Sequence, residues 1–210
     1  MPSVGFISLG CAKNQVNTEQ MISLLSEAGY TISPEADEVD VAVVNTCGFI
    51  DSAKSEAIAN ILMLAERKQL GRVGKILVAG CLSERYRDEI LEELPEVDGV
   101  LGTGSYYDIV QAVEAVLGGG RPEKFGDIDA PIPEVGRVLT TPRHYAFLKI
   151  AEGCDNHCAF CVIPSLRGRY RSRAYEDVLQ EARELAEAGV RELIVVAQDT
   201  SRYGLDLYGE

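Results

Sequence analysis

Short apolar runs alternate with helix-like stretches over the first 120 residues, and this alternation limits the possible folds more than any other feature of the chain. It is typical of βαβ units around a parallel sheet, because a crossover helix joins each pair of parallel strands. The expected strands are 4–9, 39–44, 75–79 and 99–101, and the expected helices are 18–28, 51–70, 83–94 and 106–117. Asn17 and Asp51 are expected to cap the first two helices. The sequence therefore predicts an α/β domain with a parallel sheet.

A segment rich in glycine and proline follows this first domain. Residues 118–142 contain five glycines and four prolines without a sustained period, as is typical of a domain boundary. We expect a first domain at 1–120, a linker at 121–142 and a second domain at 143–210. The second domain is expected to hold a strand at 144–150, a cysteine-rich loop, a helix at 175–188 and a strand at 192–197. Because one β-loop-α-β unit cannot close a sheet, we expect the chain to be a fragment that ends inside a larger α/β domain.

The composition indicates in which compartment the chain occurs and which classes of partner it can bind. With 46% apolar and 25% charged residues, it has the composition of a folded globular protein. No apolar run reaches the roughly 18 residues of a membrane helix, and the start lacks the features of a signal peptide, so we expect a cytoplasmic protein without membrane contact. The net charge of −13 disfavours direct nucleic acid binding by this portion. Disulfides are rare in the cytosol, so the six cysteines need another explanation.

Three of the cysteines occupy equivalent places in the predicted sheet. Cys11, Cys47 and Cys81 each come just after an expected strand. The carboxyl ends of parallel strands lie at one edge of a sheet, where α/β folds build ligand sites, so we expect these thiols to converge. Each could also be an ordinary small apolar residue. Three thiolates can hold zinc with a fourth ligand, or a 4Fe-4S cluster with one iron left open. The two histidines both lie outside the first domain, which favours the cluster.

The other three cysteines lie close together in the sequence. Cys154, Cys158 and Cys161 have the spacing Cys-x3-Cys-x2-Cys without a fourth cysteine nearby, so a cluster held by them would keep one iron open. A zinc knuckle completed by His157 or His144 is the alternative. Four arginines follow the loop, namely Arg167, Arg169, Arg171 and Arg173. They are either solvated charges or contacts to a cofactor or substrate.

This second cysteine group resembles the radical S-adenosylmethionine (SAM) superfamily, in which an aromatic residue precedes the last cysteine, as Phe160 does here. Both halves together resemble the radical SAM methylthiotransferase family. Its members pair a parallel-sheet α/β domain that carries three cysteines with a radical SAM barrel, a partial TIM-like barrel. Residues 8–19, 163–168 and 197–200 are similar to the branch that modifies a ribosomal protein, although Asn17 and Thr18 stand where that branch has Asp-Ser. The tRNA-modifying branch typically opens Gly-Cys-Gln-Met-Asn instead.

The resemblance implies two 4Fe-4S clusters and SAM as cofactors. The implied ligands are Cys154, Cys158 and Cys161 for the cluster that cleaves SAM, and Cys11, Cys47 and Cys81 for an auxiliary cluster whose open iron carries the sulfur to be transferred. Phe160, Gln198 and Asp199 match positions near the cofactor in the family.

The reaction that the resemblance implies is methylthiolation of the β-carbon of an aspartate in small-subunit ribosomal protein twelve. One SAM methylates the bound sulfur, and a second supplies the radical that removes hydrogen from that carbon. The implied partners are this ribosomal protein and an electron donor of the flavodoxin or ferredoxin type. Two alternatives stay open. One is a tRNA adenosine methylthiotransferase. The other is a metal-binding or interaction module that is inactive alone, since the family's later barrel strands and C-terminal TRAM domain would lie beyond Glu210.

Overall fold

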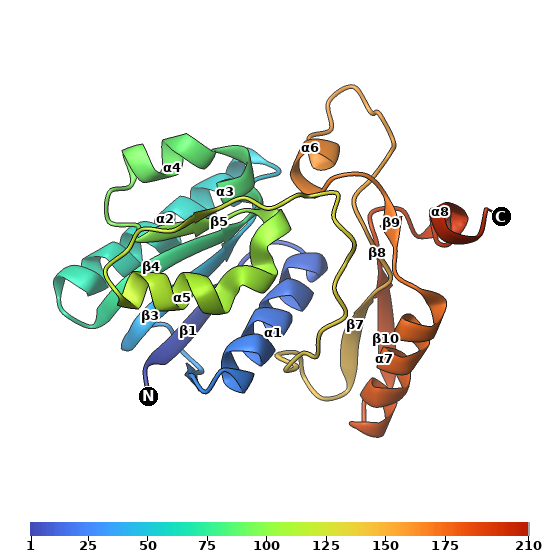
Figure 1. Cartoon of the computed structure of the whole chain (residues 1–210), viewed down its shortest axis with the longest axis horizontal. Helices are drawn as coiled ribbons and strands as arrows, with labels where there is room; N and C mark the ends of the chain where they lie inside the picture. Colours follow the sequence, from blue (N-terminus) through green and yellow to red (C-terminus); the bar gives the residue numbers. More distant parts are fainter. Residues whose placement is uncertain (210) are drawn as a thin grey trace.

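Six parallel strands form the centre of the first unit in the computed structural model, which describes residues 1–209 (Figure 1). They are β1 (Ser3–Ser8), β2 (Thr31–Ser33), β3 (Val39–Thr46), β4 (Val73–Gly80), β5 (Gly99–Leu101) and β6 (Glu123–Lys124). The order along the sheet is β2-β1-β3-β4-β5-β6, and every neighbouring pair is parallel. The predicted fold class is confirmed. The sequence did not predict the two edge strands, β2 and β6, because they are too short to form a recognisable apolar run.

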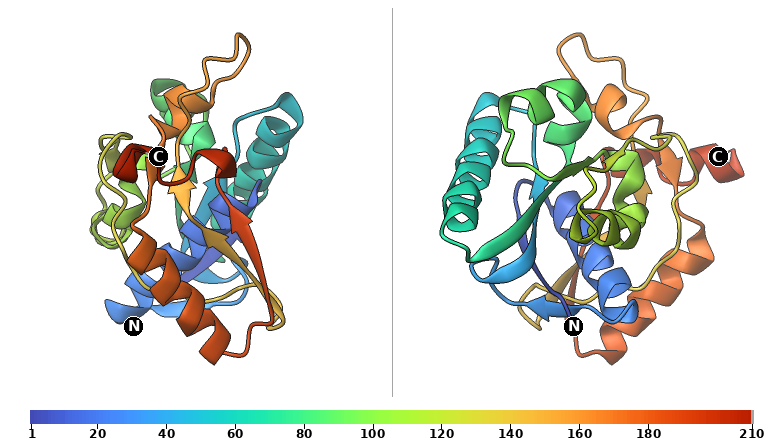
Figure 2. Two further views of the ribbon diagram at one scale, coloured as in Figure 1. Left: turned by 90° about the vertical axis from the view of Figure 1, so that its right-hand side faces the viewer. Right: turned by 60° about the vertical axis from the view of Figure 1, so that its left-hand side comes forward.

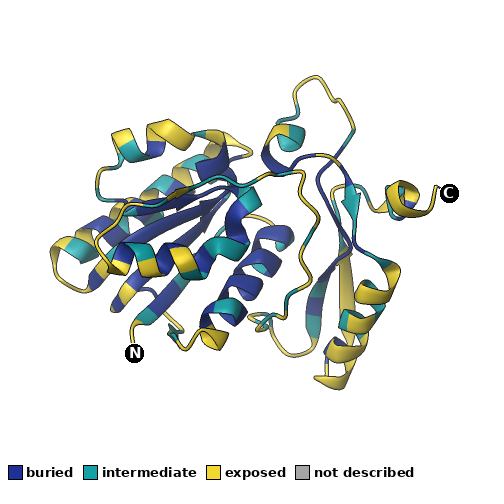
Figure 3. Ribbon diagram, viewed as in Figure 1, coloured by how far each residue is buried: buried dark blue, intermediate teal, exposed yellow. Residues whose placement is uncertain are grey.

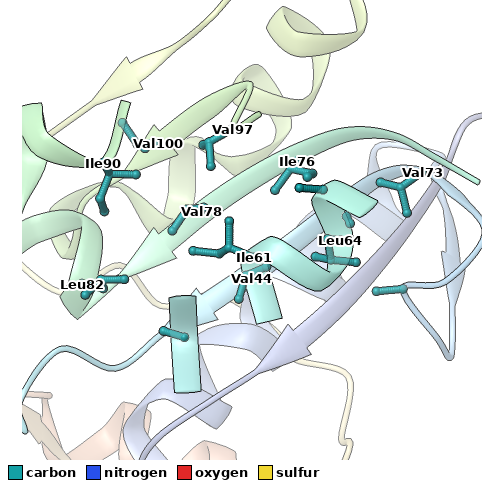
Figure 4. Packing of buried hydrophobic residues seen from close by; sticks show 14 of the residues in the cluster. Val44, Ile61, Leu64, Val73, Ile76, Val78, Leu82, Ile90, Val97 and Val100 are labelled. Carbon is teal, nitrogen blue, oxygen red and sulfur yellow. The ribbon is translucent and has the colours of Figure 1, made fainter. Parts of the chain in front are cut away.

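Helices cover both faces of this sheet (Figures 1 and 2). One face carries α1 (Ala12–Glu27), the 3-10 helix η1 (Thr103–Asp108) and α5 (Ile109–Leu117), and the other carries α2 (Asp51–Gln69), α3 (Cys81–Arg85) and α4 (Arg87–Glu93). The stretch predicted as one helix at 83–94 is thus two helices that meet at Tyr86. The central strands are continuous apolar runs because they are buried on both faces. Figure 4 shows Ile61 of α2 packed with Val44 and Val78, all fully buried.

The second unit is smaller and its sheet is open. Its elements are β7 (Tyr145–Lys149), β8 (Ala151–Glu152), α6 (Ile163–Arg167), β9 (Arg171–Ser172), α7 (Tyr175–Glu187), β10 (Glu192–Val196), η2 (Thr200–Arg202) and α8 (Leu205–Tyr208). β7 and β10 pair in parallel, and β8 pairs with β9 antiparallel. Figure 3 shows that β10 and α7 are largely exposed, whereas α1 of the first unit is largely buried. Among residues 1–209, no helix has the length and apolar character that a bilayer span requires.

The segment 121–142 connects the two units and packs against both (Figure 1). After β6, its Arg137 reaches Glu19 of α1 at 3.0 Å and Glu181 of α7 at 2.8 Å. Glu19 also accepts hydrogen bonds from the backbone N–H and the hydroxyl of Thr140, at 2.8 and 2.9 Å. The Arg137 and Glu19 side chains are buried, so these ion pairs fix the segment between the units.

Two predicted helix caps are wrong. α1 begins at Ala12, six residues earlier than predicted, with Cys11 in the N-cap position, so Asn17 lies inside the helix. Ile50 occupies the N-cap position of α2, and Asp51 is its first helical residue. The first turns of α1 are polar and therefore did not show an apolar period. They are nevertheless buried, because they contact the second unit rather than solvent.

A partly buried carboxylate, Asp98, ties β4 to α2. It accepts hydrogen bonds from the Lys68 and Lys75 ammonium groups, at 2.5 and 3.1 Å, and from the Ile76 backbone N–H, at 2.8 Å. Burial raises the pKa of Asp98, but these hydrogen bonds outweigh it and hold the pKa below its usual range.

Replacing Asp98 by asparagine is expected to lower the free energy of unfolding by about 1–3 kcal/mol at pH 7, because charge-assisted hydrogen bonds are lost. A depressed folded-state pKa contributes stability above the unfolded value of about 4, and this stability is lost as the pH falls through the folded value. Urea unfolding at pH 7 and below pH 4 should therefore show a difference that shrinks in acid. Glu66→Gln, on the exposed face of α2, is the control. A difference that does not change with pH would contradict the assignment.

Candidate functional site

The first three cysteines lie at the carboxyl ends of three adjacent strands. Cys47 directly follows β3, Cys81 directly follows β4, and Cys11 comes three residues after β1. The register pairs β1 with β3 up to their last residues, and likewise β3 with β4, so the three strand ends lie side by side. Cys47 is within electrostatic range of both Cys81 and Cys11. The structure thus brings the three strand ends together, and the role of the three thiols as metal ligands stays a prediction.

Glycines next to two of these cysteines let the strand ends approach each other. Gly10 has a φ of +92°, and a Cβ there would lie 2.6 Å from the Cβ of Cys47. Gly80 has a φ of +101°, and its Cβ would lie 2.5 Å from the carbonyl oxygen of Thr46. Both distances are too short for any side chain, and both φ values favour glycine. The close approach of the strand ends that carry these cysteines therefore depends on the two glycines.

The three thiols differ in exposure and surroundings. Cys11 is exposed at the N-cap position of α1, Cys47 is partly buried, and Cys81 is buried. Burial raises the pKa of the Cys47 thiol, and the neighbouring Cys81 and Cys11 raise it further. A hydrogen bond from the Phe49 backbone N–H and the positive charge of Arg167 oppose this rise. The site therefore places thiols of different accessibility around one region that opens toward solvent at Cys11.

The second cysteine group lies in the loop between β8 and α6, which projects from the molecule in both Figures 1 and 2. Cys154 is buried, Cys161 is partly buried and Cys158 is exposed. The loop is tightly turned, because the Cys161 N–H donates to the Cys158 carbonyl and the Cys158 N–H donates to the Asn156 carbonyl, both at 3.0 Å. Phe160 is 92% exposed and touches no core.

Asp199 and Gln198, the other two residues predicted to lie near SAM, have separate surroundings. Asp199 follows β10 and accepts a hydrogen bond of 3.2 Å from the side-chain amide of Asn156 in the cysteine loop. The carboxylate itself is exposed, and a hydrogen bond from the Ser201 hydroxyl lowers its pKa. Gln198 instead accepts a hydrogen bond from Lys13 of α1, at the boundary between the units. Asp199 is thus beside the second cysteine group, and Gln198 joins the two units.

Arg167, at the end of α6, reaches from the second unit to the first cysteine group and to α1. It comes six residues after Cys161, is 3% exposed, and lies within electrostatic range of Cys81 and Cys11. Its guanidinium donates hydrogen bonds to the side-chain carbonyls of Asn14 and Asn17 in α1. For this residue the interpretation as a solvated loop charge is wrong.

A buried ion-pair network surrounds Arg167. Glu152 accepts contacts from Arg167 at 3.2 Å, Lys149 at 3.3 Å and Lys13 at 3.7 Å, and all four side chains are under 10% exposed. Burial raises the pKa of Glu152, but the three cations outweigh it and hold the pKa well below its usual range. Three cationic side chains therefore share one carboxylate next to the first cysteine group. The sequence could not indicate this network, because its partners come from both units.

Residues 1–209 contain no three His, Cys, Asp or Glu side chains placed to hold a single metal ion. His144 lies at the amino end of β7, whereas the cysteine loop follows its carboxyl end, so the strand separates them. Each of the two groups supplies three free thiols, and cysteine thiolates are the standard ligands of iron–sulfur clusters. The two groups therefore match cysteine-held clusters in the chemistry of their donors.

Comparison with known proteins matches both units. Residues 3–102 match the model of the "Uncharacterized protein family UPF0004", and residues 148–208 match that of the Radical SAM superfamily. The chain is 53% identical over 211 residues to the ribosomal protein uS12 methylthiotransferase RimO of Pelotomaculum thermopropionicum, covering 99% of this chain and 47% of that protein. The chain belongs to the radical SAM methylthiotransferase family. A second member of the family, the protein of the same name from Symbiobacterium thermophilum, is 54% identical over 206 residues, with 98% and 42% covered.

The chain spans about half the length of the curated relatives it matches. Among solved structures, it is similar to the radical SAM methyltransferase TsrM of Kitasatospora setae with tryptophan and a SAM analogue bound, with a TM-score of 0.65 at 11% identity. That likeness covers 99% of this chain and 49% of TsrM, and it concerns the fold alone. The predicted architecture, a parallel-sheet domain followed by the start of a radical SAM domain, is confirmed, and the superfamily match supports an iron–sulfur cluster and SAM as cofactors.

Proposed function

We propose that this chain is the cluster-binding part of an enzyme that attaches a methylthio group to the β-carbon of an aspartate in ribosomal protein uS12. The observation that carries the proposal is the identity of about 50% with uS12 methylthiotransferases over both cysteine groups and the segment between them. The net charge of −13 is compatible with a basic ribosomal protein as substrate.

Each cysteine group has a separate role in this proposal. Cys154, Cys158 and Cys161 hold one 4Fe-4S cluster in the exposed loop, and Cys11, Cys47 and Cys81 hold another at the edge of the sheet. When bound, the clusters and SAM supply the radical and the methylated sulfur that the transfer requires.

The residues around the cysteines orient these groups. In this proposal Asp199, which accepts a hydrogen bond from Asn156 of the cysteine loop, interacts with SAM, and the exposed Phe160 covers the same region. Gln198, through Lys13, and Arg167, through Asn14, hold the second unit against the first, so that sulfur and radical can meet at one substrate carbon. An electron donor of the flavodoxin or ferredoxin type completes the proposed set of partners.

Mass spectrometry of uS12 and of tRNA from a strain lacking this gene is the direct test. We expect uS12 to lose one methylthio group at an aspartate, tRNA to keep its methylthio groups, and the intact gene to restore uS12. Loss of methylthio groups from tRNA with uS12 unchanged would contradict the proposal and assign the chain to tRNA modification.

A further inference from the structure

A groove of about 290 Å³ runs between α2 and α4, on the face of the first unit's sheet that α1 does not cover. Its apolar lining consists of Ile58, Leu82, Tyr86, Ile90 and Leu94. Leu82 and Ile90, both labelled in Figure 4, are buried in the core beneath the groove. Ile58 lies outside that core cluster and is only partly buried. The groove therefore has an apolar floor and an apolar side chain that the core does not use.

The groove lies beside the first cysteine group. Leu82, in its floor, directly follows Cys81 in the chain. Two further apolar side chains, Phe49 and Ile50, separate Cys47 from α2, and they are 43% and 55% exposed. Exposed apolar side chains that gather next to a functional site are typical of a surface that binds a partner. A partner held in this groove would thus lie close to the first cysteine group.

The side of the groove formed by α4 is strongly acidic. Four of the seven residues of this helix are exposed carboxylates, namely Asp88, Glu89, Glu92 and Glu93. None of them takes part in an ion pair within residues 1–209, because Arg87, the one cation of α4, pairs with Glu84. On the α2 side, the Lys54 ammonium lies 3.9 Å from the centre of the Tyr86 ring. The apolar floor is therefore bordered by negative charge that these residues leave unpaired.

Charge and position favour one kind of occupant. An apolar groove with an acidic rim is complementary to a segment in which apolar residues alternate with lysines and arginines. A basic ribosomal protein, the substrate in the proposed function, can supply such a segment. A second copy of this chain, with its net charge of −13, would instead bring like charge to the rim. The chain leaves the described part at α8, which Figure 1 places at the opposite side of the molecule from α2 and α4.

We propose that the groove between α2 and α4 docks a basic segment of uS12, with an apolar side chain of that segment against Ile58 and its cations beside Glu89 and Glu93. The inference rests on the proposed function and adds a docking surface outside the cysteines and their neighbours. Docking here holds the substrate beside Cys81 and Cys47 and so raises the local concentration of the target aspartate there.

Binding of purified, fluorescently labelled uS12 to the full chain tests the docking surface. Glu89→Lys together with Glu93→Lys reverses the charge of the rim, and Ile58→Ser removes the apolar contact. Glu184→Lys together with Glu187→Lys is the matched control, because both residues are exposed on α7 and the net charge changes by the same amount. Fluorescence anisotropy at low and at high salt gives the dissociation constant of each variant.

We expect the rim variant to bind uS12 about tenfold more weakly than the control at low salt, and the difference to shrink at high salt, where exposed charges are screened. Ile58→Ser should weaken binding by about tenfold at both salt concentrations, since burial of an apolar side chain does not depend on screening. The unfolding midpoints should stay close to that of the parent, because the rim residues are exposed and Ile58 lies outside the core cluster.

The outcomes separate the docking surface from the proposed function. If the parent binds uS12 and both groove variants bind it as tightly as the control, docking in this groove is overturned and the proposed function stands. Failure of the parent chain to bind uS12 would also overturn the docking surface. The proposed function is judged independently, by the methylthio content of uS12 in the strain that lacks the gene.

Photo-crosslinking identifies the occupant directly. A benzophenone side chain is placed at position 58 of the full chain, and the chain is irradiated in the presence of uS12. We expect a cross-link to uS12 that the Glu89→Lys and Glu93→Lys changes suppress. A cross-link to a second copy of the chain alone would mean that the groove is an interface between copies, and would overturn the proposal.

Discussion

A variant with Cys11, Cys47 and Cys81 replaced by alanine should retain about four irons per chain after anaerobic reconstitution, whereas the parent chain should hold about eight. The same halving is expected when Cys154, Cys158 and Cys161 are replaced instead, and no iron should remain when all six are changed. The physical reason is that each group supplies three thiolates to its own cluster from a separate unit of the fold.

The effect on the reaction should be larger than the effect on iron content. Methylthiolation of uS12 needs both groups, so either triple change in the intact gene should reduce it by more than about 100-fold, beyond the range typical of changes around a metal ligand. Iron analysis, visible absorbance and mass spectrometry of uS12 measure the three quantities. Ser55→Ala, on the exposed face of α2, is the control and should leave all of them unchanged. A colourless protein with stoichiometric zinc would contradict both cluster assignments.

The positions of the cysteines in the fold could be predicted because they depend on local pattern. Cys11, Cys47 and Cys81 follow apolar runs long enough to indicate strands, and parallel strands bring their carboxyl ends to one edge. For Cys154, Cys158 and Cys161, the spacing in the sequence alone was enough to predict that they share one loop. The α/β class with a parallel sheet follows from the same periodicity, whereas the order of the strands in the sheet does not.

The polar residues between the units could not be predicted in the same way. Lys13, Asn14 and Asn17 interrupt the apolar period of α1, so the sequence predicts a helix that starts after them with Asn17 as its cap. Their burial depends on Arg167 and Glu152, more than 130 residues later in the chain. Pairings of this kind leave no periodic signal, because each member by itself has the sequence signature of an exposed polar residue.

Glu152→Gln is expected to destabilise the chain by about 3–5 kcal/mol, the cost of leaving buried charges without their partner. The substitution keeps the size of the side chain but removes the one negative charge that Lys13, Lys149 and Arg167 share. Because Lys13 belongs to α1 and the other three residues to the second unit, the contact between the units should loosen together with the second unit itself.

Urea unfolding at pH 7 measures this effect, and Glu184→Gln, on the exposed side of α7, should stay within about 0.5 kcal/mol of the parent. The folded-state pKa of Glu152 is depressed, so its contribution should persist below the unfolded value of about 4.3 and be lost only in stronger acid. Adding Lys149→Met to Glu152→Gln should recover part of the stability, because one of the uncompensated charges disappears as well. If the double variant were as unstable as the sum of the two single variants, Lys149 and Glu152 would not be coupled, and the ion pair between them would not stabilise the fold.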